Sequence, residues 1–200
     1  MIAKVTKKLT FDQFLVECPE NGCYELVNGE IVEIISTRNH MDVADYIRDS
    51  FYTQIKNLSL NYVVTNQTAI RTVTQAGVEQ GRRPDVSIID RNLWRYDRSA
   101  YAAVREPIQL AVEVTSMNWN VDYIHKLDEY QRLGISEYWV VDYLGIASSK
   151  FIGKPKTPTI FVHLLDADGN YQTTAFKGSE RIVSRTFPGL TLTAEQVMNA

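Results

Sequence analysis

The chain has 200 residues, of which 44% are hydrophobic and 22% charged, a composition typical of an ordinary globular protein and a length that fits one domain over residues 1–200. The net charge of -3 and the isoelectric point near 5.7 argue against a large basic surface that coats nucleic acid, although they leave room for a small basic cleft. No apolar run approaches the roughly 18–20 residues of a membrane span, and the charged start lacks the apolar core of a secretory signal. We therefore expect a cytoplasmic protein without membrane contact.

The start of the chain predicts a short helix followed by a turn. Thr10 and Gln13 have the spacing of a capping box, which indicates a helix over residues 11–17. Cys18 and Cys23 then flank a turn-like segment, and their spacing matches no metal-binding motif. We interpret them as reduced thiols rather than as a disulfide.

A β-hairpin and a long helix come next. Asn28-Gly29 between two alternating runs is a strong hairpin signal, so we predict paired strands within residues 24–34. Apolar side chains at helical spacing predict an amphipathic helix over about residues 40–58. The chain then predicts, in order, a strand at 62–70, a polar turn at 75–81 and a strand at 83–89. The connection at 90–106 has no clear period, so we expect a flexible loop or a short helix there.

The segment from residue 108 to residue 142 predicts a strand, a helix and a second strand. An apolar run at residues 108–114 precedes a helix at about 121–133, which Gly134 ends, and a strand at 138–141 follows. A helix of this length between two strands forms a crossover, so we expect the two strands to be parallel.

The last quarter predicts a second hairpin. Its expected elements are a loop at 145–158, strands at 159–165 and 171–176 around a turn at 166–170, edge strands at 181–183 and 190–192, and a final helical turn capped by Thr193. The predicted fold class is α/β, with a mixed sheet flanked by helices and with N-terminal and C-terminal hairpins.

Two carboxylates stand out within this plan. Glu113 interrupts an otherwise apolar strand, and a buried charge is costly unless a metal ion or a lysine compensates it. Asp85 follows Pro84 at the start of another apolar strand. If these strands are neighbours, the two carboxylates meet and offer the hard oxygen ligands that Mg²⁺ or Mn²⁺ takes.

The predicted helix adds a cation. Asp122, Lys126 and Tyr130 recur every four residues and share one face. Taken singly, each residue has an ordinary explanation, because a Pro-Asp pair is common in turns and Asp122 with Lys126 makes a common helix ion pair. Together with Glu113 and Asp85, however, Lys126 completes a set suited to metal-assisted phosphodiester cleavage.

Several segments, in this order, resemble successive motifs of the Uma family (Uma-two), restriction-endonuclease-like proteins of the PD-(D/E)XK nuclease superfamily. They are residues 24–30, His40, Arg83-Pro84-Asp85-Val86, Glu113-Val114-Thr115-Ser116, Asp122 with Lys126 and Tyr130, and residues 134–139. The resemblance covers roughly residues 11–142, and the remaining tail is more generic.

The resemblance implies a restriction-endonuclease-like sheet flanked by helices, with Mg²⁺ or Mn²⁺ held by Asp85 and Glu113. Most superfamily members keep a lysine two residues after the glutamate, whereas this chain has Thr115 there. In Uma-like sequences the lysine lies in the following helix, which implies that Lys126 supplies the charge.

The resemblance also assigns roles to residues outside the metal pair. Glu25 is the candidate for the additional catalytic acid that superfamily members contribute from near the N-terminus. His40, Asp122 and Tyr130 are candidates for contacting substrate or supporting the ligands. Trp139 is expected to pack in the core or on the surface.

We therefore predict a divalent-metal-dependent endonuclease that hydrolyses phosphodiester bonds, with DNA favoured over RNA. Modest basic loops suit transient binding; they contain Arg91, Arg95, Arg98, Lys150, Lys154 and Lys156. The alternative is a nuclease-fold binding or assembly module with weak or no turnover, dimerising through the tyrosine-rich loop at residues 94–101.

Overall fold

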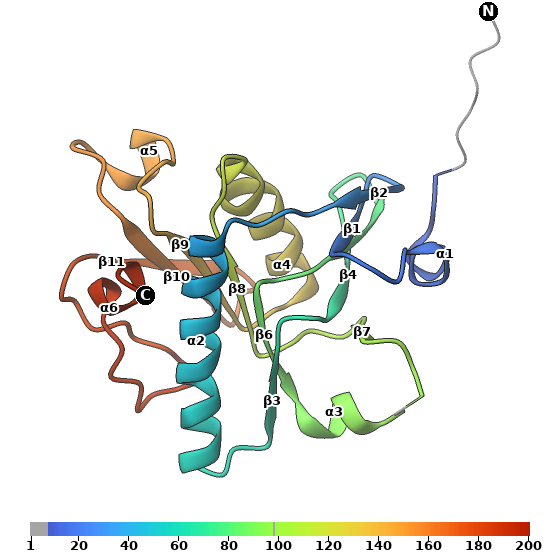
Figure 1. Ribbon diagram of the computed structural model, residues 1–200, viewed down its shortest axis with the longest axis horizontal. Helices are drawn as coiled ribbons and strands as arrows, with labels where there is room; N and C mark the ends of the chain where they lie inside the picture. The colour runs from blue at the N-terminus through green and yellow to red at the C-terminus, as the bar shows by residue number, and fades with distance from the viewer. Residues whose placement is uncertain (1–7, 98) are drawn as a thin grey trace, which may run out of the picture.

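In the computed structural model, which describes residues 8–97 and 99–200, the strands divide between two mixed sheets (Figure 1). The five-stranded sheet has the order β2 (Glu30–Glu33), β1 (Tyr24–Val27), β5 (Glu79–Arg82), β4 (Ala69–Val73), β7 (Ala103–Val104). The six-stranded sheet has the order β11 (Tyr171–Phe176), β10 (Thr159–Leu165), β9 (Glu137–Asp142), β8 (Leu110–Val114), β6 (Val86–Asp90), β3 (Tyr62–Thr65). The predicted fold class is confirmed, and so are the two predicted hairpins.

Most helices begin where a side chain caps the free backbone N–H groups of the first turn, whereas η1 and α4 begin without a side-chain cap. They are α1 (Phe11–Glu17), α2 (Arg38–Asn57), α3 (Arg91–Arg95), the π-helix η1 (Val121–Lys126), α4 (Leu127–Leu133), α5 (Ser149–Ile152) and α6 (Ala194–Met198). Thr10 forms the predicted capping box of α1. Thr193 caps α6 as predicted, through a capping box with Gln196, and Thr37 caps α2. Gly134 ends α4 with a φ of 90°, as predicted. None of the helices within the described residues is long and apolar enough to cross a membrane.

The six-stranded sheet is covered on both faces. Successive side chains of a strand point in opposite directions, so a single strand contacts both covering layers. In β8, Leu110 and Val112 pack with Ile47 and Phe51 of α2 on one face. Ala111 packs on the other face with side chains of η1 and α4. Burying Phe51 completely stabilises the fold by about 1.5–3 kcal/mol. By the same alternation, Glu113 lies on the η1 and α4 face.

The register of three strands places the predicted carboxylates together. β8 and β9 are parallel, as the crossover predicts, with Leu110 opposite Glu137. β6 runs antiparallel to β8, with Val86 opposite Val112. The start of β6 and the end of β8 therefore meet at one edge of the sheet. Asp85, directly before β6, lies in the connection that carries the chain from one sheet to the other.

Two predictions in the middle of the chain are wrong in detail. Residues 62–70 are not one strand but contain β3 and the start of β4, which belong to different sheets. A turn at Thr65 separates the two strands, and its Oγ1 accepts a hydrogen bond from the Gln67 N–H. The polar turn at residues 75–81 is shorter than predicted, and its second half forms β5, which pairs with β4. Gln80 is buried there, so its polarity misled the sequence prediction.

Further differences concern the connections. Residues 121–126 form a π-helix instead of the start of an α-helix, and α5 lies in the loop at 145–158. The connection at 90–106 contains α3, which agrees with the short-helix alternative, and also the unpredicted strand β7. The prediction of edge strands at 181–183 and 190–192 is wrong. In this part of the described chain, the β-pairing is an isolated bridge between Arg181 and Thr193. Both cysteines are free thiols, as predicted.

Candidate active site

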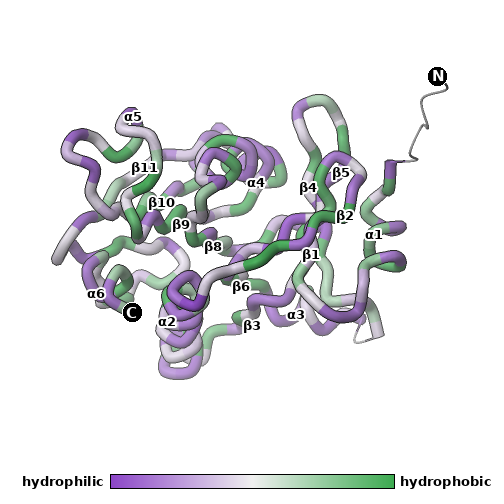
Figure 2. Tube along the Cα trace, turned by 45° about the horizontal axis from the view of Figure 1, so that its top comes forward, coloured by the Kyte–Doolittle hydropathy of each residue, from purple (hydrophilic) through white to green (hydrophobic). Residues whose placement is uncertain are grey.

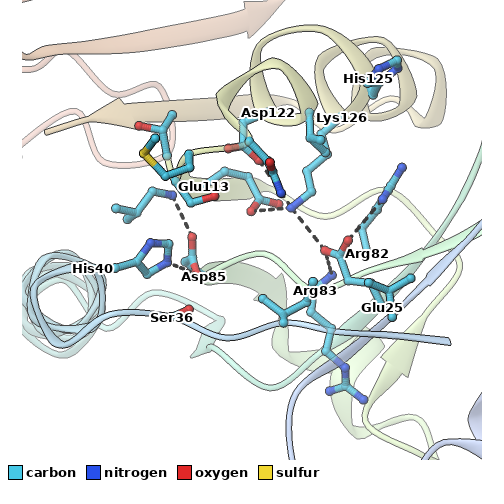
Figure 3. Close-up of a pocket in the computed structure, with 18 of the residues that line it drawn as sticks. Glu25, Ser36, His40, Arg82, Arg83, Asp85, Glu113, Asp122, His125 and Lys126 are labelled. Atoms are coloured by element: carbon cyan, nitrogen blue, oxygen red, sulfur yellow. Dashed lines mark hydrogen bonds and ion pairs between the residues drawn. The ribbon is translucent and has the colours of Figure 1, made fainter. Parts of the chain in front are cut away.

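Six of the seven predicted site residues line a cavity of about 740 Å³ at the junction of the two sheets (Figure 3), and the seventh, Tyr130, lies behind Glu113. Its walls come from β1, the first turn of α2, the end of β8 and η1. Glu25, His40, Asp85, Glu113, Asp122 and Lys126 all contribute to this lining.

Asp85 is fixed from two sides. Its Oδ2 accepts a hydrogen bond from the Val114 N–H at 2.7 Å, which ties it to the end of β8. Its Oδ1 lies 2.8 Å from Nε2 of His40. His40 occupies the first turn of α2, where Thr37 caps its N–H. Burial opposes the charged imidazole, but the hydrogen bond and charge of Asp85 outweigh it and raise the pKa of His40 above its ordinary value.

Glu113 is buried, with both carboxylate oxygens engaged. Oε2 accepts a hydrogen bond from Nζ of Lys126 at 2.8 Å, and Oε1 accepts one from the Tyr130 hydroxyl at 2.6 Å. Burial raises the pKa of Glu113 well above its ordinary value. The charge of Lys126 offsets part of this increase, whereas the nearby charges of Asp85 and Asp122 add to it.

Lys126 serves three carboxylates at once. Besides Glu113, its Nζ lies 3.2 Å from Glu25 Oε1 and 3.5 Å from Asp122 Oδ1 (Figure 3). Burial disfavours its charge, but these carboxylates outweigh that effect and hold its pKa well above the ordinary value. Burial likewise raises the pKa of Asp122 to about 6, so one ammonium does not balance the surrounding acids. Among the residues that the structure describes, no ion pair joins Lys126 to Asp85.

The sequence did not reveal the second cation of this network. Arg82, which is 4% exposed, contacts Glu25 Oε2 at 3.1 Å through one guanidinium nitrogen. It contacts Glu129 through two others at 2.8 and 2.7 Å, and Glu129 also accepts a hydrogen bond from Thr72. Burial works against the charged form of Glu25, yet Lys126 and Arg82 lower its pKa. Arg82 lies between the predicted turn at 75–81 and the predicted strand at 83–89, where nothing in the sequence indicated this role.

Thr115 does not stand in for a lysine. It is buried, and its Oγ1 lies 3.3 Å from both the Val141 carbonyl oxygen and Asp142 Oδ1 at the end of β9. The ammonium that reaches Glu113 comes from η1 instead. Single-turn π-helical segments occur frequently at functional sites, and this one carries both Asp122 and Lys126.

The seven predicted residues thus fall into two adjoining groups. Glu25, Glu113, Asp122, Lys126 and Tyr130 form one contact network, and Asp85 with His40 forms a pair joined to the same strand end through Val114. Their catalytic roles stay predictions.

The cavity fits a divalent cation in donor type and in charge. Within residues 8–97 and 99–200, no group of three or more His, Cys, Asp or Glu side chains is arranged to hold a metal ion. Mg²⁺, however, usually takes only one or two carboxylates and keeps several waters. Asp85 and Glu113 supply such a pair, and each carboxylate oxygen can accept more than one contact. The excess of acids around Lys126 favours an additional positive charge.

Comparison with known proteins agrees with this architecture. A crystal structure of a protein from Anabaena variabilis, described as "a putative nuclease belonging to DUF820", superposes with a TM-score of 0.71 at 14% sequence identity. The alignment covers 96% of this chain and 98% of that one, and at this identity it shows the shared fold. No curated protein matches the chain. The model of the family described as "Uma2: Putative restriction endonuclease" matches residues 11–195. The chain therefore belongs to the Uma2 family of restriction-endonuclease-like proteins.

Proposed function

We propose that this protein is a divalent-metal-dependent endonuclease that hydrolyses phosphodiester bonds in DNA. The observation that carries the proposal is the placement of Asp85 and Glu113 at adjoining ends of β6 and β8, with Lys126 Nζ 2.8 Å from Glu113. Family membership supports the reaction class. Metal dependence rests on the chemistry of these residues, and the choice of DNA rests on the description of the family as a putative restriction endonuclease.

In this proposal Asp85 and Glu113 hold Mg²⁺ or Mn²⁺. The ion, when bound, supplies Lewis-acid stabilisation of the charge that develops on the phosphate oxygens. The protein's own contribution is orientation. The Val114 N–H and His40 fix Asp85, while Tyr130 and Lys126 fix Glu113, so both carboxylates are set before substrate arrives.

Lys126 places a permanent positive charge beside the reacting phosphate. Its ammonium is buried, so little water screens it and its effect on a developing negative charge is larger than at the surface. Glu25 holds the other side of this ammonium, with Arg82 behind it. Glu25 therefore acts as the additional acid of the site by positioning Lys126.

The test is cleavage of supercoiled plasmid and of labelled oligonucleotides with Mn²⁺, Mg²⁺ or a chelator. We expect Asp85→Asn and Glu113→Gln to lose at least about 100-fold in rate while remaining folded. Glu17→Gln, at the exposed end of α1, is the matched control and should cut normally. Isothermal titration should show Mn²⁺ binding to the wild type that both site variants weaken. An RNA strand of the same sequence tests the preference for DNA.

A folded wild-type protein that leaves plasmid, linear and single-stranded DNA intact with Mn²⁺ would refute the endonuclease proposal. That result would support the second candidate function, a nuclease-fold binding or assembly module. It is favoured by the engagement of both Glu113 oxygens by Lys126 and Tyr130. Light scattering tests dimerisation through the loop at residues 94–101. Tyr96 and Tyr101 of this loop are exposed, and Arg98 lies outside the described residues.

A further inference from the structure

The exposed lining of the cavity combines polar residues (Asn28, Thr37, Ser116, Asn118 and His125) with large apolar side chains, whereas its buried floor is charged. Ile35, Met117 and Leu144 line the cavity and are 84%, 83% and 54% exposed. We call these three side chains the apolar rim. Such large apolar side chains gathered at the opening of one cavity indicate a contact surface.

The fold brings the rim together from three separate segments. Met117 follows β8 and Leu144 follows β9, and because these strands are parallel, the segments that leave them meet at one edge of the sheet. Ile35 lies between β2 and α2. Figure 2 shows a hydrophobic stretch in this connection, which fades to neutral before the hydrophilic start of α2. The rim therefore surrounds the same sheet edge at which Asp85 and Glu113 lie.

The cations of the cavity are committed to protein groups. Lys126 contacts three carboxylates, and Arg82 contacts Glu25 and Glu129. The Arg83 guanidinium donates to the carbonyl oxygens of Tyr24 and Gln67. A protein that holds duplex DNA by its phosphates commonly neutralises about 6–10 of them. The described lining does not offer such a set.

These observations favour one form of nucleic acid over another. A duplex presents charged phosphates and hides its bases, so contact with the rim would dehydrate phosphates without compensation. An unpaired nucleotide instead presents the apolar face of its base. Its flexible backbone also lets the attached phosphate reach Glu113, which is only 3% exposed. The cavity volume of about 740 Å³ is ample for a small ligand.

We propose that the substrate is DNA with an unpaired nucleotide, whose base packs on Ile35, Met117 and Leu144 while its phosphate enters the acidic site. This inference rests on the proposed endonuclease function, because it names the substrate of that site. Enzymes that act within a duplex must first extrude the nucleotide, whereas single strands and unpaired ends need no such step.

Binding is measured first with Ca²⁺ present, because without a cation the carboxylates of the site would repel the phosphate, and a gel checks that the labelled DNA stays uncut. Fluorescence anisotropy compares a labelled single strand, its perfect duplex, and the same duplex with an unpaired flap. We expect the single strand and the flap to bind at least about tenfold tighter than the duplex. The double variant Ile35→Ser with Met117→Ser should lose most of this difference. Val183→Ser, 62% exposed and absent from the cavity lining, should keep it.

Cleavage of the same three substrates with Mn²⁺ then separates the two proposals. Preferred cutting of unpaired DNA that the rim variant abolishes supports both. Cutting of the duplex at an equal rate overturns the rim proposal and leaves the endonuclease proposal standing. Rim-dependent binding of single strands without cutting overturns the endonuclease proposal alone. If the rim variant changes the oligomeric mass but not DNA binding, a second copy covers the rim and the inference is wrong.

Discussion

The substitution Lys126→Met tests whether the ion network is held together by its buried ammonium. Methionine keeps most of the aliphatic stem and removes the charge. Lys126 is 7% exposed, and its Nζ contacts Glu113 at 2.8 Å, Glu25 at 3.2 Å and Asp122 at 3.5 Å. Removing one partner of a buried ion pair costs about 3–5 kcal/mol, since it leaves a buried charge uncompensated.

The magnitude should lie near the lower end of that range. Arg82 continues to pair with Glu25, and the Tyr130 hydroxyl continues to bond Glu113. The acids left without a cation are therefore Glu113 and Asp122. We expect a loss of about 3 kcal/mol, and for a chain of this size each kcal/mol lowers the melting temperature by roughly 2–4 °C. The expected decrease is roughly 6–12 °C.

Urea unfolding followed by circular dichroism measures this loss. Lys150→Met, an exposed lysine, is the control and should change the free energy of unfolding by less than about 0.5 kcal/mol. Adding Glu113→Gln to the Lys126→Met protein should restore part of the stability, because the orphaned carboxylate is then neutral. A double-mutant cycle gives the coupling directly. If Lys126→Met unfolds at the same urea concentration as the wild type, the network does not depend on this charge.

Three further predictions concern residues outside the metal pair. Burial lowers the pKa of His163 to about 4 from an ordinary 6.5, so the unfolded chain binds a proton first and stability falls between pH 6.5 and pH 4. The loss in the free energy of unfolding reaches about 3 kcal/mol. In His163→Phe, the free energy of unfolding measured with urea should therefore fall less between pH 7.5 and pH 4.5 than in the wild type. Arg82→Gln should cost about 3–5 kcal/mol in the same assay at pH 7.5, because Glu25 and Glu129 lose their shared cation. Gly29→Ala should lower the melting temperature more than Gly169→Ala; both have positive φ, but only at Gly29 would the new Cβ meet a neighbour, Lys8 Cβ at 2.5 Å.

The parts of the fold that the sequence predicted depend on local chemistry. The Thr10 capping box, the Thr193 cap, the Asn28-Gly29 turn and the Gly134 helix end are each decided within a few residues. The parallel pairing of β8 and β9 follows from the length of the crossover. The division of the strands between two sheets does not have such a local cause. Residues 62–70 read as one strand because both halves are apolar, and only the packing of each half decides its sheet.

The candidate site divides in the same way. Asp85 and Glu113 were recognisable because each carboxylate adjoins an apolar strand, and the strands prove to be neighbours. Lys126 was recognisable through its helical spacing and the family resemblance. Arg82 was not, because it is one polar residue among others in a short segment. Its partners Glu25 and Glu129 lie 57 and 47 residues away in the chain, so only the tertiary structure brings them together.

The displaced lysine has a simple geometric reason. Glu113 and the residue two positions later would share a face if β8 continued, but β8 ends at Val114. Thr115 instead contacts the end of β9 through its hydroxyl. The element that covers the Glu113 face is η1, so a lysine in η1 reaches the carboxylate from above the sheet. Under the proposed function the site uses a cation on that face, and the position of this cation in the sequence is secondary. For this reason the missing lysine at position 115 does not by itself argue against catalysis.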